Sequence, residues 1–152
     1  MSRLLLVPLL VSVASLAFGC GENSMPSVQE LEPSIVAARD RVDFALERIT
    51  RAQSRDELLE RMDEAADAIA AAAGDLEGVG TPKDYESEVG KLVVSLRQLA
   101  FDVQATADRI RQPGFGDLLV GTRGLSFESW EVNLALAGLK GRGIEVALLD
   151  RH

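Results

Sequence analysis

Residues 85–110, YESEVGKLVVSLRQLAFDVQATADRI, contain the pattern that decides the fold of this chain. One set of residues recurs here at alternating spacings of four and three positions. They are Tyr85, Val89, Leu92, Leu96, Leu99, Val103, Thr106 and Ile110. Because an α-helix turns about every 3.6 residues, these side chains lie on one face and can pack against a neighbouring helix. The pattern predicts a long helix that stops at Gln112-Pro113-Gly114.

The start of this helix is marked by Thr81 and Pro82. Thr81 can cap the helix, and Pro82 suits the first helical position because a residue there needs no partner for its N–H group. The next acidic residues would offset the positive end of the helix dipole. They are Asp84, Glu86 and Glu88.

A second apolar pattern of the same kind predicts a helix that begins at Ser54. Ser54 and Glu57 have the spacing of a capping box. The apolar positions that follow are Leu58, Met62, Ala65, Ile69, Ala72 and Leu76. Gly74, Gly78 and Gly80 are expected to end this helix, because glycine favours helix ends.

A third pattern precedes it and predicts another helix. Its members are Val28, Leu31, Ile35, Ala38, Val42, Ala45, Ile49 and Ala52. Pro33 falls inside the pattern, and proline is tolerated only in the first turn of a helix. We therefore expect the continuous helix to begin near Glu32.

The C-terminal part predicts a shorter fourth helix after a loop at residues 114–125, with one short helical turn at residues 117–120. Ser126 is the expected cap, with Glu128 and Glu131 in the early turns. The expected buried face comprises Phe127, Trp130, Leu134 and Ala137, and the expected end comprises Gly141 and Gly143. Residues 144–149 alternate as an extended tail would, which packs back onto the helices or pairs with a strand edge of a partner.

These patterns predict an all-α protein. Residues 32–152 are expected to form an antiparallel helical bundle of three long helices and a shorter fourth, and the chain length of 152 residues fits one domain. A dimeric coiled coil is the alternative, and the short connections favour folding back within one chain. Residues 20–31 have the composition of a tether that leads into the bundle.

The N-terminus, residues 1–19, has the features of a secretory signal peptide. Arg3 supplies a positive charge, and residues 4–18 are largely apolar. Fifteen helical residues span about 22 Å, which is shorter than the ~30 Å hydrocarbon core of a bilayer. This length favours a signal segment over a permanent membrane span.

The segment ends in Leu16-Ala17-Phe18-Gly19-Cys20, which resembles the lipobox of bacterial lipoproteins. Gly19 and Cys20 match the motif, and Ala17 and Phe18 fit its broader form. The resemblance implies that the Cys20 thiol carries a diacylglycerol, that cleavage makes Cys20 the N-terminus, and that the lipid anchors the exported domain to the cell membrane or an outer membrane. An ordinary secretory signal and an uncleaved anchor are the alternatives.

The mature chain is similar in architecture to small helical lipoproteins of high-GC Gram-positive bacteria. The shared features are the short tether, the Ser-capped second helix, the Gly-Thr-Pro sequence before the third helix and the glycines after the fourth. This resemblance implies no particular activity.

Composition excludes several functional classes. The chain has 16 Lys and Arg residues against 24 Asp and Glu residues, so its net charge of −8 argues against nucleic acid as a partner. One Cys and one His cannot form a disulfide scaffold, a haem attachment motif or a Cys/His zinc site. The histidine is His152, at the end of the sequence given, so a His-based catalytic triad is not expected. We expect no cofactor and no enzymatic activity.

Two acidic sets carry the oxygen ligands that a hard cation prefers. The set Asp63, Glu64 and Asp67 is interpreted as a solvated helix face, and the set Asp84, Glu86 and Glu88 as compensation of the helix dipole. The Gly-rich stretches at residues 114–116 and 138–143 lack the preceding strand of a phosphate loop and are interpreted as turns.

Four residues remain as a possible ligand or partner surface: Tyr85, Phe115, Arg123 and Trp130. Trp130 is interpreted as a core residue. The leading hypothesis is a lipid-anchored, non-catalytic bundle that binds or scaffolds a partner protein. One alternative is a module for a small molecule or lipid, with a pocket bordered by Phe115 and Trp130. The other is a carboxylate-only enzyme acting on cell-wall glycans, which needs two facing carboxyl groups about 5–9.5 Å apart.

Overall fold

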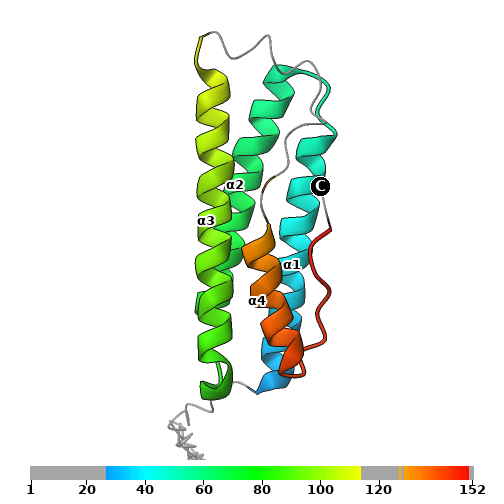
Figure 1. Ribbon diagram of the computed structural model, residues 1–152, viewed down its shortest axis with the longest axis vertical. Helices are drawn as coiled ribbons and strands as arrows, with labels where there is room; N and C mark the ends of the chain where they lie inside the picture. The colour runs from blue at the N-terminus through cyan, green and yellow to red at the C-terminus, as the bar shows by residue number, and fades with distance from the viewer. Residues whose placement is uncertain (1–26, 114–126, 128, 151–152) are drawn as a thin grey trace, which may run out of the picture.

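The computed structural model describes residues 27–113, 127 and 129–150 (Figure 1). Four helices pack against one another, and these residues contain no strand. The helices are α1 (Val28–Thr50), α2 (Arg55–Gly78), α3 (Glu86–Arg111) and α4 (Trp130–Gly141), and a 3₁₀ turn, η1 (Lys83–Tyr85), precedes α3. The prediction of an all-helical packed domain is confirmed.

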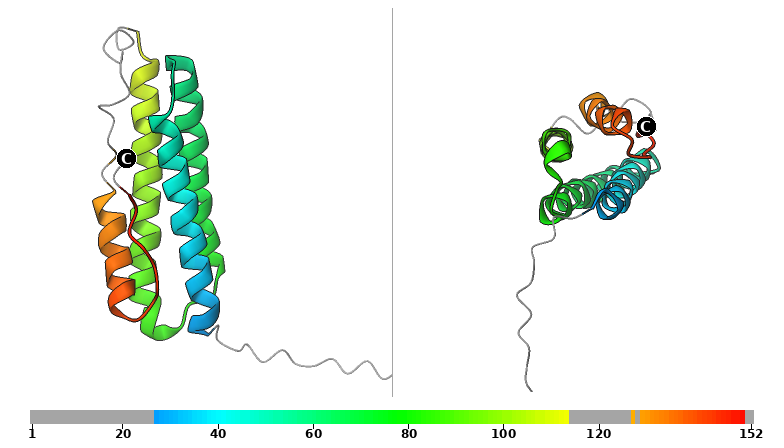
Figure 2. Two further views of the ribbon diagram at one scale, coloured as in Figure 1. Left: turned by 90° about the vertical axis from the view of Figure 1, so that its right-hand side faces the viewer. Right: turned by 90° about the horizontal axis from the view of Figure 1, so that it is seen from below.

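The helices follow one another around the bundle in chain order. Figure 1 shows α1, α2 and α3 as long rods and the shorter α4 in front of them. α2 packs against α1 and α3, and α4 packs against α3. The view from below in Figure 2 shows the C-terminal tail, residues 144–150, between α4 and α1. The tail therefore covers the side of the bundle that the short α4 leaves open.

The core is entirely apolar. None of the buried residues in the described ranges is polar or charged. Groups able to recognise a ligand therefore lie at the surface and in grooves between the helices.

Helix α1 begins at Val28, earlier than the expected start near Glu32. Residues 28–31 of the predicted tether are therefore helical, and Pro33 lies inside the helix rather than in its first turn. The expectation was wrong because it was based only on the unfavourable effects of proline, which are a lost backbone hydrogen bond and a clash of its ring with the preceding turn.

Two features stabilise this early start. The Glu30 carboxylate accepts the backbone N–H of Ser27 at 3.1 Å, which is half of a capping box. Leu31 and Ile35 are both fully buried, one on each side of Pro33. Burying a leucine or isoleucine contributes roughly 1.5–3 kcal/mol, which offsets much of the proline's cost.

Helix α2 begins as predicted. Ser54 Oγ accepts the N–H of Glu57 at 3.2 Å, while the Glu57 carboxylate accepts the N–H of Gln53 at 2.7 Å. All six apolar positions predicted for this helix are buried. Gly74 does not end the helix, which continues to Gly78 because the apolar pattern runs on for another turn.

The start of α3 differs from the prediction. Regular helix begins at Glu86, after η1, so Thr81 does not cap it and Pro82 does not occupy its first position. Thr81 Oγ1 instead donates to the carbonyl oxygen of Val79 at 3.4 Å. The N–H of Tyr85 donates to the carbonyl of Pro82 at 2.8 Å and closes the 3₁₀ turn.

The body of α3 confirms the pattern that decides the fold. Six of the eight predicted positions are buried, and Tyr85 and Thr106 are half-buried. Ala107 takes the buried place next to Thr106. The helix ends at Arg111, just before the predicted stop.

Helix α4 buries the face opposite to the predicted one. Of the predicted face, Trp130, Leu134 and Ala137 are exposed, whereas Phe127, which precedes the helix, is partly buried against the core. The buried residues are Val132, Ala135, Leu136 and Leu139. The prediction failed because α4 carries apolar residues on all sides, so their spacing does not identify the inward face.

The structure tests only some of the predictions for the two ends of α4. Ser129 stands before its first residue, and the predicted cap Ser126, Glu128 and the loop with its short turn lie outside the described residues. The helix ends at Gly141 as expected, and Gly143 adopts a positive φ of 94°.

The tail packs onto the helices, as expected. Ile144, Val146 and Leu149 are buried, and side chains bind the tail's backbone. Asn133 Oδ1 accepts the N–H of Leu149 at 2.7 Å, and Arg39 donates to the Leu148 carbonyl at 2.6 Å.

The predicted signal peptide at residues 1–19 and Cys20 lie outside the described residues. Among the helices that are described, none combines the length and the apolar character needed to cross a bilayer.

Candidate functional site

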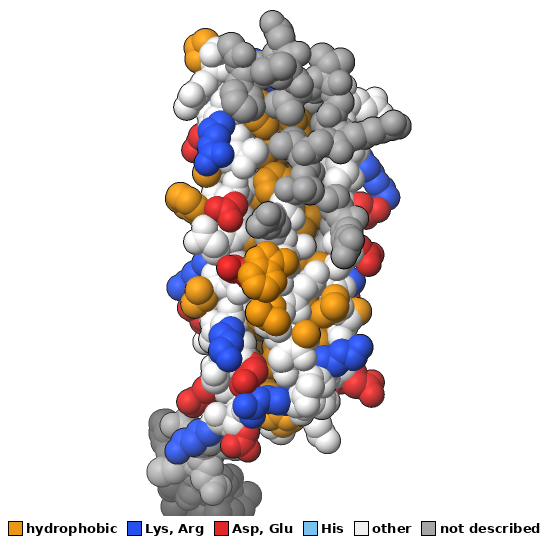
Figure 3. Space-filling model, in the orientation of Figure 1, with side chains coloured by type: hydrophobic (Ala, Val, Ile, Leu, Met, Phe, Trp, Pro, Cys, Tyr) orange, Lys and Arg blue, Asp and Glu red, His pale blue; other side chains and the backbone are white. Residues whose placement is uncertain are grey.

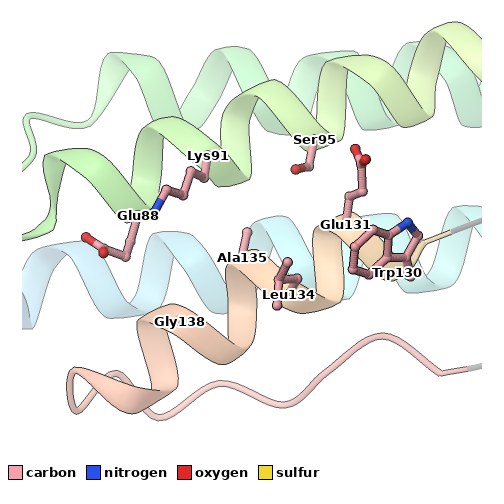
Figure 4. A pocket seen from close by; sticks show the side chains of 8 residues that line it. All are labelled: Glu88, Lys91, Ser95, Trp130, Glu131, Leu134, Ala135 and Gly138. Atoms are coloured by element: carbon pink, nitrogen blue, oxygen red, sulfur yellow. The ribbon is translucent and has the colours of Figure 1, made fainter.

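A groove runs along the line where α4 packs against α3 (Figure 4). Its volume is about 490 Å³, within the ~300–1,000 Å³ typical of ligand sites. Its lining residues are Glu88, Lys91 and Ser95 from α3 and Trp130, Glu131, Leu134, Ala135 and Gly138 from α4. We refer to it as the α3–α4 groove.

The apolar wall of the groove is largely exposed to solvent. Trp130 and Leu134, one helical turn apart, each have 60% of their surface accessible. Figure 3 shows hydrophobic side chains gathered over α4 on this face, between charged side chains. The interpretation of Trp130 as a core residue is therefore wrong. Adjacent exposed apolar side chains at a hollow are typical of interaction surfaces.

Three other large apolar residues that are about as exposed as Trp130 lie outside this groove. Phe44 lies on α1, and Val94 and Phe101 lie on the outer side of α3. Val94 also lines a smaller hollow between α2 and α3, which the ion pair between Arg97 and Glu77 spans at 2.5 Å. Single exposed apolar residues are normal on protein surfaces.

Two charged side chains in the α3–α4 groove make no interaction with the rest of the described chain. Neither the Lys91 ammonium nor the Glu131 carboxylate forms a hydrogen bond or ion pair there. Figure 4 shows Lys91 extending toward Glu88, and Glu131 next to Trp130 at the other end. Both charges are therefore available to a ligand.

Glu88 closes one end of the groove. Its Oε1 lies 3.1 Å from Nη2 of Arg142, and its Oε2 is buried and accepts no hydrogen bond from the described residues. A Cβ added at Gly138 would lie 3.7 Å from Glu88 Cγ, an ordinary contact distance. The carboxylate is thus held at the groove end, and Arg142 offsets its charge.

A second hollow of about 300 Å³ extends the groove at the other end. It shares Ser95, Trp130 and Glu131 with the first hollow and continues to Asp102. The Asp102 carboxylate accepts a hydrogen bond from Gln98 at 2.9 Å. No Lys or Arg is among the described residues that line this hollow. This end of the groove is therefore acidic.

Tyr85, a predicted surface residue, does not line the groove. Its hydroxyl donates to the carbonyl of Arg142 at 3.1 Å, and the Arg142 guanidinium donates to the carbonyl of Asp84 at 2.8 Å. These bonds fasten the end of α4 to the start of α3. Tyr85 therefore positions one wall of the groove.

Trp130 lines the groove, and it is the one other predicted site residue that the structure describes. Phe115, Arg123, Cys20 and His152 lie outside the described residues. Sequence reasoning missed Lys91, Ser95, Asp102 and Glu131. Their sequence positions could have indicated them. Lys91, Ser95 and Asp102 lie along one edge of the apolar helix face predicted at residues 85–110.

The acidic set Asp63, Glu64 and Asp67 takes part in contacts between helices. Asp63 pairs with Arg111 of α3, and Glu64 pairs with Arg48 of α1 at 2.7 Å. The hydrogen bond to Asp63 raises the pKa of the Arg111 guanidinium above its usual value. The side chains of Asp63 and Glu64 keep 44% and 47% of their surface exposed, so the interpretation as a solvated face is confirmed, with ion pairs to neighbouring helices added. In the described part of the chain no cluster of three His, Cys, Asp or Glu residues is arranged to hold a metal.

Glu88 and Glu131 line the first hollow of the groove, and Asp102 and Glu131 line the second. Glu131 precedes Gly138, the neighbour of Glu88, by seven residues, which is about 10.5 Å along a helix. Glycosidases need carboxyl groups about 5–9.5 Å apart, and Arg142 already pairs with Glu88. The pair Glu88 and Glu131 therefore does not fit the geometry of that reaction.

Comparison with protein-family models, with curated proteins and with solved structures found no match for this chain. Its function is therefore inferred from the groove and from the N-terminal sequence.

Proposed function

We propose that this protein is exported, anchored to a bacterial membrane by lipid on Cys20, and binds a partner protein in the α3–α4 groove without catalysing a reaction. The observation that carries the binding proposal is the exposure of Trp130 and Leu134 side by side at a hollow. The lipobox-like sequence at residues 16–20 supports the anchor.

The exposed pair has the character of a binding anchor. Tryptophan is enriched among the residues that dominate protein–protein binding energies. A partner that covers Trp130 and Leu134 would remove their apolar surface from water, which contributes about 25 cal/mol per Å². Lys91 and Glu131 beside them can add charge specificity.

The anchor would keep this groove near the membrane. Ser27 is seven positions after Cys20, so the chain between them spans at most about 25 Å. A partner in the same membrane or at its surface is therefore within reach. The proposal treats the domain as an antiparallel bundle, which the short α1–α2 and α2–α3 connections and the course of the ribbon in Figure 1 support.

A small amphipathic molecule is the second candidate for the groove. The volume of about 490 Å³ and the indole of Trp130 favour it. The groove continues into a second hollow, however, and such an elongated shape suits a polypeptide segment better.

Cross-linking in intact cells followed by purification tests the proposal. We expect the native chain to recover a partner that the double variant Trp130→Ala/Leu134→Ala loses. Val94→Ala/Phe101→Ala removes similarly exposed apolar residues outside the groove and should keep the partner. Cys20→Ala should lower recovery by releasing the protein from the membrane. Equal recovery by both double variants, or no partner with the native chain, would contradict the proposal.

A further inference from the structure

The α3–α4 groove is long enough for several turns of a helix. Its two hollows together run along α3 from Glu88 to Asp102. Fourteen residues of helix correspond to about 21 Å. The hollows join at Ser95 and Trp130, so a single extended occupant can contact both.

The apolar surface of the groove matches one face of a helix. Trp130 and Leu134 stand four residues apart on α4, and anchors at i and i+4 of a docked helix would meet them. Ala135 and Gly138 add only small side chains to the lining, which allows the backbone of the occupant to approach.

The charges give the occupant a direction. Asp102 and Glu131 line the hollow at one end, with no described Lys or Arg beside them, while Lys91 lies nearer the other end. Glu131 is in the first turn of α4, where the helix dipole supplies about half a positive charge. Two carboxylates outweigh that half charge.

The same end can hold a cation over an aromatic ring. The Trp130 indole lines this hollow together with Asp102 and Glu131. A Lys or Arg side chain gains from the face of tryptophan as well as from carboxylates. The net charge of −8 on the whole chain also favours the approach of a basic partner.

We propose that the groove receives a basic amphipathic helix of the partner protein, with its apolar side on Trp130 and Leu134 and its Lys or Arg residues beside Asp102 and Glu131. This inference rests on the proposed function and specifies the partner's chemistry.

A pair of synthetic peptides tests it. Each is a blocked helical peptide of about 15 residues, to match the groove length, with Leu at i and i+4. One carries Lys at one end, and its twin carries Glu at the same positions. Trp130 is the only tryptophan of the chain, so its fluorescence reports binding of these Trp-free peptides. We expect the Lys peptide to bind at least about tenfold tighter than the Glu peptide.

Charge reversal in the groove should abolish or invert this preference, using the variant Asp102→Lys/Glu131→Lys. The control Glu60→Lys/Asp67→Lys changes the net charge equally on exposed positions of α2 and should keep it. Equal binding of both peptides, binding of neither, or the same loss in both variants would overturn the inference. Recovery of a partner by the native chain in cells would still leave the proposed function standing, so the two failures are distinguishable.

Discussion

Trp130 and Leu134 lie one turn apart on the solvent side of α4, while Leu136, on the opposite side of the same helix, is fully buried. The helix is thus apolar on both faces, and only one of these faces is buried in the folded domain. Leaving the second face in water has no benefit for the stability of the domain. Its place at the groove agrees with a role in binding.

Substitutions on the two faces of α4 should separate stability from binding. We expect Trp130→Ala/Leu134→Ala to change the free energy of unfolding by less than about 1 kcal/mol, because both side chains are mostly exposed. Leu136→Ala should cost about 2–5 kcal/mol, because it leaves a cavity in the core. Urea unfolding followed by circular dichroism measures both. A large loss for the exposed pair would mean that these side chains support the fold.

The glycines around α4 should respond in opposite directions. Gly138 is inside the helix and has ordinary space for a Cβ, so Gly138→Ala should stabilise the protein by about 0.4–1 kcal/mol. Gly143 has a positive φ of 94°, so Gly143→Ala should destabilise it by about 1 kcal/mol or more. Thermal unfolding compares the two variants, and a loss of stability in Gly138→Ala would contradict the helix packing described here.

The tail depends on the amide of Asn133. Its Oδ1 accepts the N–H of Leu149 at 2.7 Å, and its Nδ2 donates to the carbonyl of the same residue at 3.3 Å. Asn133→Ala should cost about 1–3 kcal/mol and raise hydrogen exchange at Leu149. The control Gln98→Ala removes an exposed amide from α3 and should leave the exchange at Leu149 unchanged. Unchanged exchange in Asn133→Ala would show that the tail is held by other contacts.

Much of the fold could be predicted because three helices carry a long apolar pattern with regular spacings of three and four residues. In α3 the spacing continues without a break from Val89 to Ile110, so it identifies the buried face even though Val94 and Phe101 lie outside it. In α4 Trp130 and Leu136 lie on opposite sides, and no spacing rule chooses between them. Contact with α3 decides, through the buried Ala135 and Leu139.

The groove could not be predicted for a related reason. Lys91 and Asp102 are ordinary exposed positions on α3 until α4 packs beside them. The aromatic ring of Tyr85 suggests a surface role, yet its hydroxyl donates to the backbone carbonyl of Arg142 and fixes the end of α4. Such pairings over 57 positions of the sequence depend on tertiary packing.

The lipid anchor makes a prediction about the mature N-terminus. Mass spectrometry of the membrane fraction should find a chain that begins at Cys20 with the added mass of acyl chains. Cys20→Ala should leave an uncleaved or soluble form. A native chain that keeps Met1, or begins at another residue without lipid, would contradict the anchor and leave the groove proposal untouched.

Photo-cross-linking from the solvent face of α4 tests the central claim most directly. A photoreactive residue in place of Ala137 lies on this face, and one in place of Ala71 occupies a similarly exposed position on α2. We expect irradiation of intact cells to give a discrete adduct of higher mass from position 137 and none from position 71. Equal adducts from both positions, or none from position 137, would contradict the assignment of this face as the binding surface.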